Sequence, residues 1–124
     1  MRAILPVLLL FSVLSAHAAE DDGVINCKYD GNQQEMNTCA VRDFKATDSA
    51  LNEKYKELMS SLSLANQQRL RKEQRAWLKM RDPKCKSEAK LSEGGSIWPL
   101  EFYGCLQSAT TQRNKELEQW QHNR

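Results

Sequence analysis

The chain has 124 residues, of which 18 are basic and 16 acidic, and its formal net charge at pH 7 is +2. A protein this close to neutrality has no general electrostatic attraction for nucleic acid or for an anionic membrane, which argues against both as partners. Its length is enough for one small domain.

The first residues have the three parts of a secretory signal peptide. Arg2 supplies the positive charge, residues 4–14 are apolar, and Ala-His-Ala at 16–18 places small side chains at a cleavage site. We predict cleavage after Ala18, which leaves residues 19–124 as a single helical domain. The apolar run is shorter than the roughly twenty residues of a membrane-spanning helix, so an anchor is the less favoured alternative. The mature protein is expected to be periplasmic or secreted, with no stable membrane anchor.

The next part of the chain predicts one long amphipathic helix. Residues 19–32 are polar and contain the Asp30–Gly31 pair, which is typical of a turn. From about Gln33, residues spaced three or four apart form one largely apolar face. These residues are Ala40, Phe44, Thr47, Leu51, Tyr55, Leu58 and Leu62.

Two further helices are predicted. Ser63 is a suitable N-cap for the second helix, and Pro83 is expected to end it. Its inward positions are Leu70, Gln74, Trp77 and Arg81, with Leu78 beside them. Residues 84–98 are expected to form a loop with a flexible centre, and Pro99 to be the first residue of the third helix. The inward positions of that helix are Phe102, Leu106, Ala109, Arg113, Leu117 and Trp120.

No segment alternates with the period of a strand, so the sequence predicts an all-α protein, an antiparallel three-helix bundle. Basic residues gather on the second helix, where they interleave with Glu73 and apolar positions. They are Arg69, Arg71, Lys72, Arg75, Lys79 and Arg81. A solvated helix face is the favoured interpretation, and an anion-binding patch is the alternative.

The four cysteines, Cys27, Cys39, Cys85 and Cys105, predict two disulfides in an exported chain. The predicted topology places all four at one end of the bundle. Sequence alone does not choose among the three possible pairings, but this topology favours Cys27–Cys39 and Cys85–Cys105. A zinc site is disfavoured because no two cysteines have the close spacing that zinc sites use.

Several polar residues fall on or beside the inward faces of the helices. They are Asp48, Asn52, Gln74, Arg81, Asp82 and Arg113. A buried arginine needs a carboxylate partner, and Asp48 and Asp82 are available. A structural network that fixes the helix register is the favoured interpretation, and a polar recognition site is the alternative.

Catalysis has little support in the sequence. The single histidine after the leader is His122, and it lies near the C-terminus, away from any candidate nucleophile. No pair of carboxylates is marked as a glycosidase pair, and no metal-ligand cluster is evident. We therefore expect neither an enzyme nor a cofactor-binding protein.

Four segments together resemble the LprI-like lysozyme-inhibitor family, which consists of small exported bacterial proteins with four cysteines. The segments are Met36-Asn-Thr-Cys-Ala40, Asp48-x-x-Leu-Asn-x-x-Tyr55, Gln74-Arg-Ala-Trp-Leu78 running on to Arg81-Asp82 and Cys85, and Glu93-Gly-Gly-Ser96 followed by Cys105-Leu106, Thr110 and Arg113. The Pro83-Lys84 pair departs from the small or acidic residues usual in the family.

The resemblance implies a helical domain that binds a protein partner, lysozyme, and inhibits it. Lysozymes are typically basic proteins with an acidic catalytic cleft, so an inserted loop is one possible mechanism. The candidate binding loop consists of Lys90, Ser92, Glu93, Gly94, Gly95 and Ser96. Its serines could donate to catalytic carboxylates, and Lys90 could pair with one. A plain connector between helices is the alternative for this loop, and a non-inhibitory periplasmic interaction module is the alternative for the protein.

Overall fold

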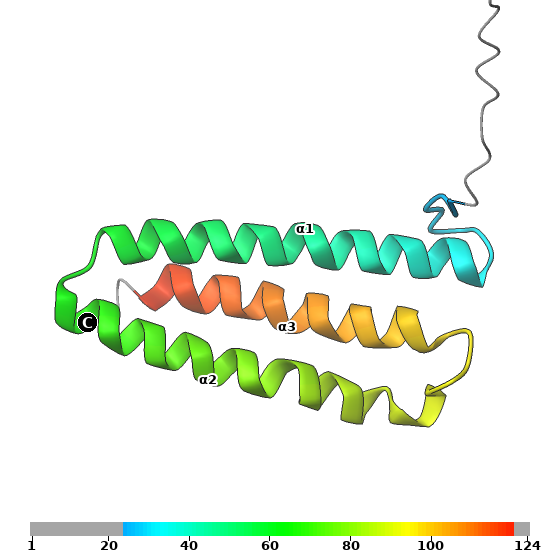
Figure 1. The fold of residues 1–124 in the computed structure, drawn as a ribbon. Helices are drawn as coiled ribbons and strands as arrows, with labels where there is room; N and C mark the ends of the chain where they lie inside the picture. Colours follow the sequence, from blue (N-terminus) through cyan, green and yellow to red (C-terminus); the bar gives the residue numbers. More distant parts are fainter. Residues whose placement is uncertain (1–23, 121–124) are drawn as a thin grey trace, which may run out of the picture.

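The structure is a computed structural model that describes residues 24–120, so the proposed leader lies outside the described residues. Three helices make up the fold: α1 (Gln33–Ser60), α2 (Leu64–Glu88) and α3 (Trp98–Trp120). A short 3-10 helix, η1 (Lys90–Ser92), lies between α2 and α3. The helices run antiparallel to one another in sequence order (Figure 1). The predicted all-α three-helix bundle is confirmed.

The start of α1 is fixed by a reciprocal cap. Asn32 Oδ1 accepts a 2.9 Å hydrogen bond from the Glu35 amide, and Glu35 Oε1 accepts one of 3.2 Å from the Asn32 amide. This capping box satisfies two amide donors that a helix start leaves free. The helix therefore begins at Gln33, as the sequence predicts.

The second helix begins where expected, since Ser63 Oγ accepts from the Asn66 amide at 3.4 Å. The prediction that Pro83 ends it is wrong, because α2 continues to Glu88. A proline inside a helix removes one hydrogen bond and costs roughly 3 kcal/mol. The turn beyond it offsets that cost by burial: Cys85 and Ala89 are 0% and 2% exposed and belong to a core cluster with Phe102.

The structure differs from the sequence-based expectations in three smaller respects. The connection between α2 and α3 covers residues 89–97 rather than 84–98, because α2 is longer than predicted. Pro99 is the second residue of α3, after Trp98, where a missing amide still costs little because the first-turn amides have no helical partner. Leu78 is 43% exposed and is not part of the interior.

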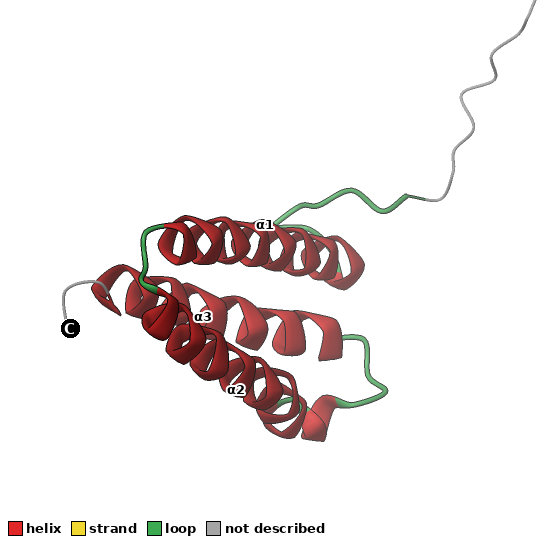
Figure 2. Ribbon diagram, turned by 60° about the vertical axis from the view of Figure 1, so that its left-hand side comes forward, coloured by secondary structure: helices red, strands yellow, loops and turns green. Residues whose placement is uncertain are grey.

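The helices pack unequally. α3 packs closely along α1, whereas α2 makes fewer contacts and makes them mostly with α3. α1 and α2 are close at the turn that joins them and diverge toward the opposite end (Figure 1). Figure 2 shows the same opening from a second direction, with the loop between α2 and α3 at the far end of the bundle.

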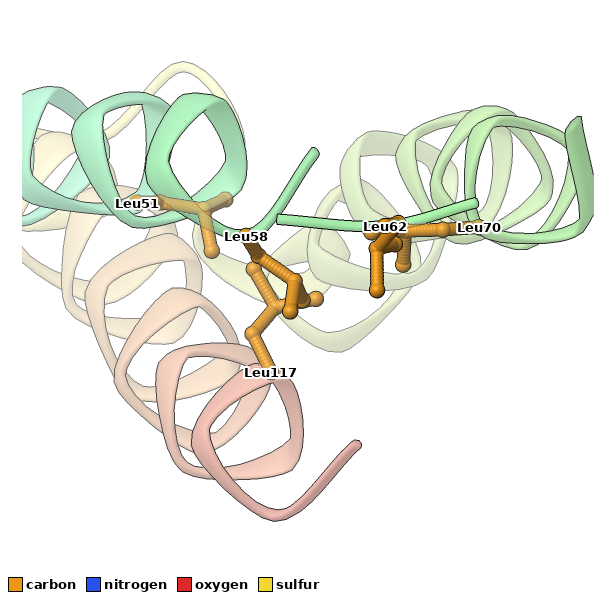
Figure 3. Packing of buried hydrophobic residues seen from close by; sticks show 5 residues of the cluster. All are labelled: Leu51, Leu58, Leu62, Leu70 and Leu117. Carbon is orange, nitrogen blue, oxygen red and sulfur yellow. The ribbon is translucent and has the colours of Figure 1, made fainter. Parts of the chain in front are cut away.

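Two apolar clusters form the core, one toward each end. At the α1–α2 turn, buried leucines from all three helices and the turn meet (Figure 3): Leu51, Leu58, Leu62, Leu70 and Leu117. At the other end the cluster consists of Cys85, Ala89, Phe102 and Leu106, and the ring of Trp98 stacks on Phe102 at 4.6 Å. This second cluster supports the loop end of the bundle.

Both predicted disulfides, Cys27–Cys39 and Cys85–Cys105, are present, and they lie at the same end of the bundle. The first joins the lead-in segment to the start of α1. The second joins the last turns of α2 to the second turn of α3, on either side of the loop. The pairing that the topology favours is therefore confirmed.

Candidate functional site

The candidate loop, residues 90–96, is closed at its base by the Cys85–Cys105 disulfide and by the aromatic cluster beneath it. Within the loop, successive turns are hydrogen bonded. The Glu93 amide donates to Lys90 O at 3.1 Å, and the Gly95 amide donates to Ser92 O at 2.9 Å. The expectation of a flexible centre is thus replaced by a folded loop with defined turns.

Two side chains tie this loop to the helices. The Ser92 hydroxyl lies between Ala89 O, at 3.0 Å, and the carboxylate of Glu101 on α3. On the opposite side, Asn37 Nδ2 on α1 donates a 2.7 Å hydrogen bond to Ser96 O. Because Asn37 and Ser96 are 59 residues apart in sequence, this contact fixes the loop against a helix that is not its neighbour in the chain.

The outer part of the loop offers groups to a partner. Leu91 is fully exposed, with a relative accessibility of 104%, and Ile97 is 41% exposed. Gly94 has a φ of 81°, a conformation that favours glycine. Within residues 24–120 the amides of Gly94 and Ser96 have no hydrogen-bond acceptor, and Lys90 has no ion-pair partner. Two backbone amides, one ammonium group and an apolar side chain are therefore available to a ligand.

The flank of the loop facing α3 is hollowed and acidic. A depression of about 470 Å³ is lined by Glu88, Ala89, Leu91, Ser92, Glu101 and Cys105. Two carboxylates, of Glu88 and Glu101, belong to its lining, and Glu93 adds a third in the loop, which also contains the ammonium group of Lys90. The carboxylates of this depression are complementary to a basic protein surface.

The predicted polar residues divide into two groups centred on arginines of α2 and α3. Arg81 Nη1 donates to Asp48 Oδ1 at 2.8 Å and to Thr110 Oγ1 at 3.3 Å, while its Nε donates to Asp82 Oδ1 at 3.0 Å. The Arg81 side chain is 9% exposed. We refer to Asp48, Arg81, Asp82 and Thr110 as the Arg81 network.

The second group is centred on Arg113, whose Nε donates to Gln74 Oε1 at 2.8 Å and whose Nη1 pairs with Glu116 at 3.0 Å. The ring of Trp77 lies between the two groups, 5.2 Å from the Arg81 guanidinium and 5.9 Å from that of Arg113. The structure therefore brings five of the six predicted polar residues into two neighbouring groups that join the helices.

Asn52, the sixth predicted polar residue, is exposed on α1 and belongs to neither group. Other contributors were missing from the predicted site, among them Leu91, Thr110 and Asn37. Leu91 lies between Lys90 and Ser92 of the predicted loop but was not among its predicted residues. Thr110 is 0% exposed and lies four residues after Leu106, so the helical period could have identified it. Asn37 bonds to the loop through a contact that local sequence does not indicate.

Nothing within residues 24–120 groups three or more potential metal ligands. In the same part of the chain, none of the helices combines the length and apolarity needed to cross a membrane. The site offers hydrogen-bond donors, carboxylates and apolar contacts, which are groups that a protein partner can bind.

Comparison with known proteins agrees with this description. The sequence model of the family "Lysozyme inhibitor LprI" matches residues 26–117. The chain is also similar to the uncharacterized protein R02472 of Rhizobium meliloti (strain 1021), with 30% identity over 132 aligned positions that cover 96% of this chain and 95% of the relative. No solved structure matches the chain. The matched region contains α1, α2, both disulfides and α3 as far as Leu117, and the chain belongs to the LprI lysozyme inhibitor family.

Proposed function

We propose that this protein inhibits a lysozyme-type muramidase by inserting the 90–96 loop into the catalytic cleft. Membership of the LprI family supports inhibition in general terms. The insertion mechanism rests on one observation: the loop presents a fully exposed Leu91 from a backbone that is already folded.

A folded loop lowers the entropic cost of binding, because fewer rotatable bonds become ordered in the complex. The disulfide at its base, the Ser92–Glu101 contact and the Asn37–Ser96 hydrogen bond each restrict the loop before any partner is present. We assign Ser92 to positioning, since its hydroxyl is engaged by Ala89 and Glu101.

The chemistry of the loop suits a glycosidase cleft. Such a cleft contains two carboxyl groups on either side of the bond to be cleaved. The free amides of Gly94 and Ser96 and the ammonium group of Lys90 are donors that an ionised carboxylate accepts. Leu91 would fill an apolar sugar subsite, and the Glu88, Glu93 and Glu101 carboxylates would face the basic surface around the cleft.

The Arg81 network has a different role in this proposal. Its arginine is nine-tenths buried, and two of its three hydrogen bonds, to Asp48 on α1 and to Thr110 on α3, join α2 to other helices. We assign it to holding α2 against α1 and α3, so that the loop at the end of α2 has one fixed position. The network therefore supports the binding loop and does not contact the muramidase.

The proposal includes export. Two disulfides require an oxidising compartment, and a family of lysozyme inhibitors acts where lysozyme acts. We propose that residues 1–18 are removed as a signal peptide and that residues 19–124 are the mature periplasmic domain. N-terminal sequencing of the protein purified from the periplasm would test the cleavage after Ala18.

The test of the function is lysis of a cell-wall suspension by lysozyme in the presence of increasing amounts of oxidised mature protein. We expect dose-dependent inhibition, and we expect it to disappear when Glu93–Ser96 is replaced by a shorter neutral linker. Retained inhibition by that folded variant would overturn loop insertion. Absence of inhibition by the wild type against several lysozyme classes would instead favour a non-inhibitory interaction module.

A further inference from the structure

The charges of this protein are distributed unevenly among its helices. α2 contains eight basic and three acidic residues and has a net charge of +5. α1 has four basic and five acidic residues, and α3 has two and three, so each has a net charge of −1. The near-neutral total of the chain therefore conceals one strongly cationic helix.

The structure separates the basic residues of α2 into engaged and free groups. Arg69 pairs with Glu73 and stacks on Trp120, and Arg81 is buried in its network. The remaining four of the sequence cluster form what we call the basic face: Arg71, Lys72, Arg75 and Lys79. These four line an open groove of about 510 Å³. None of them has an ion-pair or hydrogen-bond partner among residues 24–120.

The basic face is directed away from the bundle. Arg71, Arg75 and Lys79 follow one another at intervals of four residues, and Lys72 precedes Arg75 by three, so the four share the broad side of α2 opposite buried Leu70 and Gln74. Lys86, seven residues after Lys79, lies on the same side of α2. The row of basic side chains from Arg71 to Lys86 is therefore about 22 Å long, at 1.5 Å per residue. The row includes the carboxylate of Asp82, which already binds Arg81.

Apolar side chains flank this row. Leu78 and Met80, next to Lys79 in sequence, are 43% and 68% exposed, and Leu64 at the start of α2 is 70% exposed. Cations in a line with exposed apolar residues beside them are the pattern of a helix that lies on an anionic bilayer, with lysine and arginine stems in the headgroup layer.

We propose that the basic face of α2 binds the anionic phospholipid headgroups of a membrane surface, reversibly and without insertion of a helix. An acidic protein is the less suitable partner, because protein interfaces are depleted in lysine and enriched in aromatic anchors. The described part of α2 exposes lysines here and no aromatic side chain; Trp77 and Trp120 pack against the core.

This interaction would use a surface other than the inhibitory loop. The basic face extends along the side of α2, whereas the 90–96 loop lies beyond its end. Membrane attachment through the side of α2 thus leaves the loop accessible. The inference goes beyond inhibition and does not depend on it, because lipid binding is measured without a muramidase.

The test is co-sedimentation of the mature protein, recovered from the periplasm, with vesicles of phosphatidylcholine alone or of phosphatidylcholine containing phosphatidylglycerol. The variant is Arg75→Gln with Lys79→Gln, and the matched control is Lys45→Gln with Lys56→Gln, which removes two exposed charges from α1. We expect wild type and control to sediment only with anionic vesicles and to be released by high salt. We expect the α2 variant to bind about twenty- to thirtyfold more weakly, since each surface cation contributes about fivefold.

Three outcomes would overturn the proposal: no binding of wild type to anionic vesicles at low salt, equal losses in the two double variants, or equal binding to neutral and anionic vesicles. Competition by soluble polyglutamate at low concentration would also overturn it, in favour of an acidic protein partner. Both variants retain every core contact, and a thermal melt of each is expected to match that of the wild type.

Discussion

Arg81 on α2 donates a 2.8 Å hydrogen bond from Nη1 to the carboxylate of Asp48 on α1. The same guanidinium lies 5.1 Å from the ring of Phe44 and 5.2 Å from that of Trp77. A long planar cation is suited to this position because it extends from α2 to α1, stacks on both rings and still reaches the carboxylate.

Replacement of Arg81 tests this bridge. We expect Arg81→Ala to lower the free energy of unfolding by about 2–3 kcal/mol, since packing on two rings and a partly buried ion pair are lost together. Asp48 is one-third exposed, so its uncompensated charge remains solvated and the loss stays below that of a fully buried pair. Urea denaturation of Arg81→Ala, Asp48→Ala and the double variant is expected to give a coupling energy of about 1–2 kcal/mol. Additive losses would show that the two side chains do not interact.

Pro83 offers a stabilising substitution. It is exposed inside α2 and leaves the carbonyl of Lys79 without its helical donor. We expect Pro83→Ala to raise the free energy of unfolding by about 1–3 kcal/mol. The control is Pro99→Ala in the first turn of α3, where no helical hydrogen bond is missing and the change is expected to be within about 0.5 kcal/mol. A decrease on Pro83→Ala would show that the proline is required to orient the last turns of α2.

The two disulfides are expected to contribute differently. Each bridge joins a buried cysteine, Cys39 or Cys85, to a half-buried one, but the Cys85–Cys105 bridge closes the loop base and links residues 20 apart in sequence rather than 12. We expect Cys85→Ala with Cys105→Ala to cost about 2–4 kcal/mol in unfolding free energy and to weaken inhibition. The pair Cys27→Ala with Cys39→Ala is expected to cost less and to leave inhibition intact. Equal effects of the two double variants on inhibition would contradict the role given to the loop base.

Replacing each of two glycines by alanine is expected to change the stability of the protein in opposite directions. Gly94 has a φ of 81°, so Gly94→Ala is expected to destabilise by about 1 kcal/mol although a Cβ there meets no atom within 4 Å. Gly104 lies in α3, where a Cβ is also unobstructed, and Gly104→Ala is expected to stabilise by about 0.5–1 kcal/mol. Thermal unfolding of both variants checks this difference. A stabilising Gly94→Ala would mean that the loop does not hold the left-handed conformation.

Sequence reasoning identified the helices because their apolar positions recur with a clear period. The predicted topology brought all four cysteines to one end, which left three pairings open, and the favoured one is the one present. It failed at Pro83, where a local rule predicts a helix end but tertiary burial of Cys85 and Ala89 extends the helix. Local propensity is a weak guide wherever packing beyond the segment decides the outcome.

The candidate site was less predictable than the fold. Polar residues on inward faces correctly indicated a buried arginine bonded to Asp48, because an unpaired charge there would be too costly. The loop was expected to be flexible from its glycines and serines, yet it is fixed by Asn37, which is 59 residues from Ser96. Contacts of this kind leave no local pattern in a single sequence.

The central claim, inhibition through the loop, is tested most directly by comparing Leu91→Ser with Leu64→Ser in the lysozyme lysis assay. Both leucines are exposed, but Leu64 lies at the α1–α2 turn, the opposite end of the bundle from the loop. Burial of one leucine in a cleft contributes about 1.5–3 kcal/mol, so we predict that Leu91→Ser weakens inhibition by about ten- to a hundredfold while Leu64→Ser leaves it unchanged. Unchanged inhibition by Leu91→Ser, with or without an effect of Leu64→Ser, would contradict insertion of the loop.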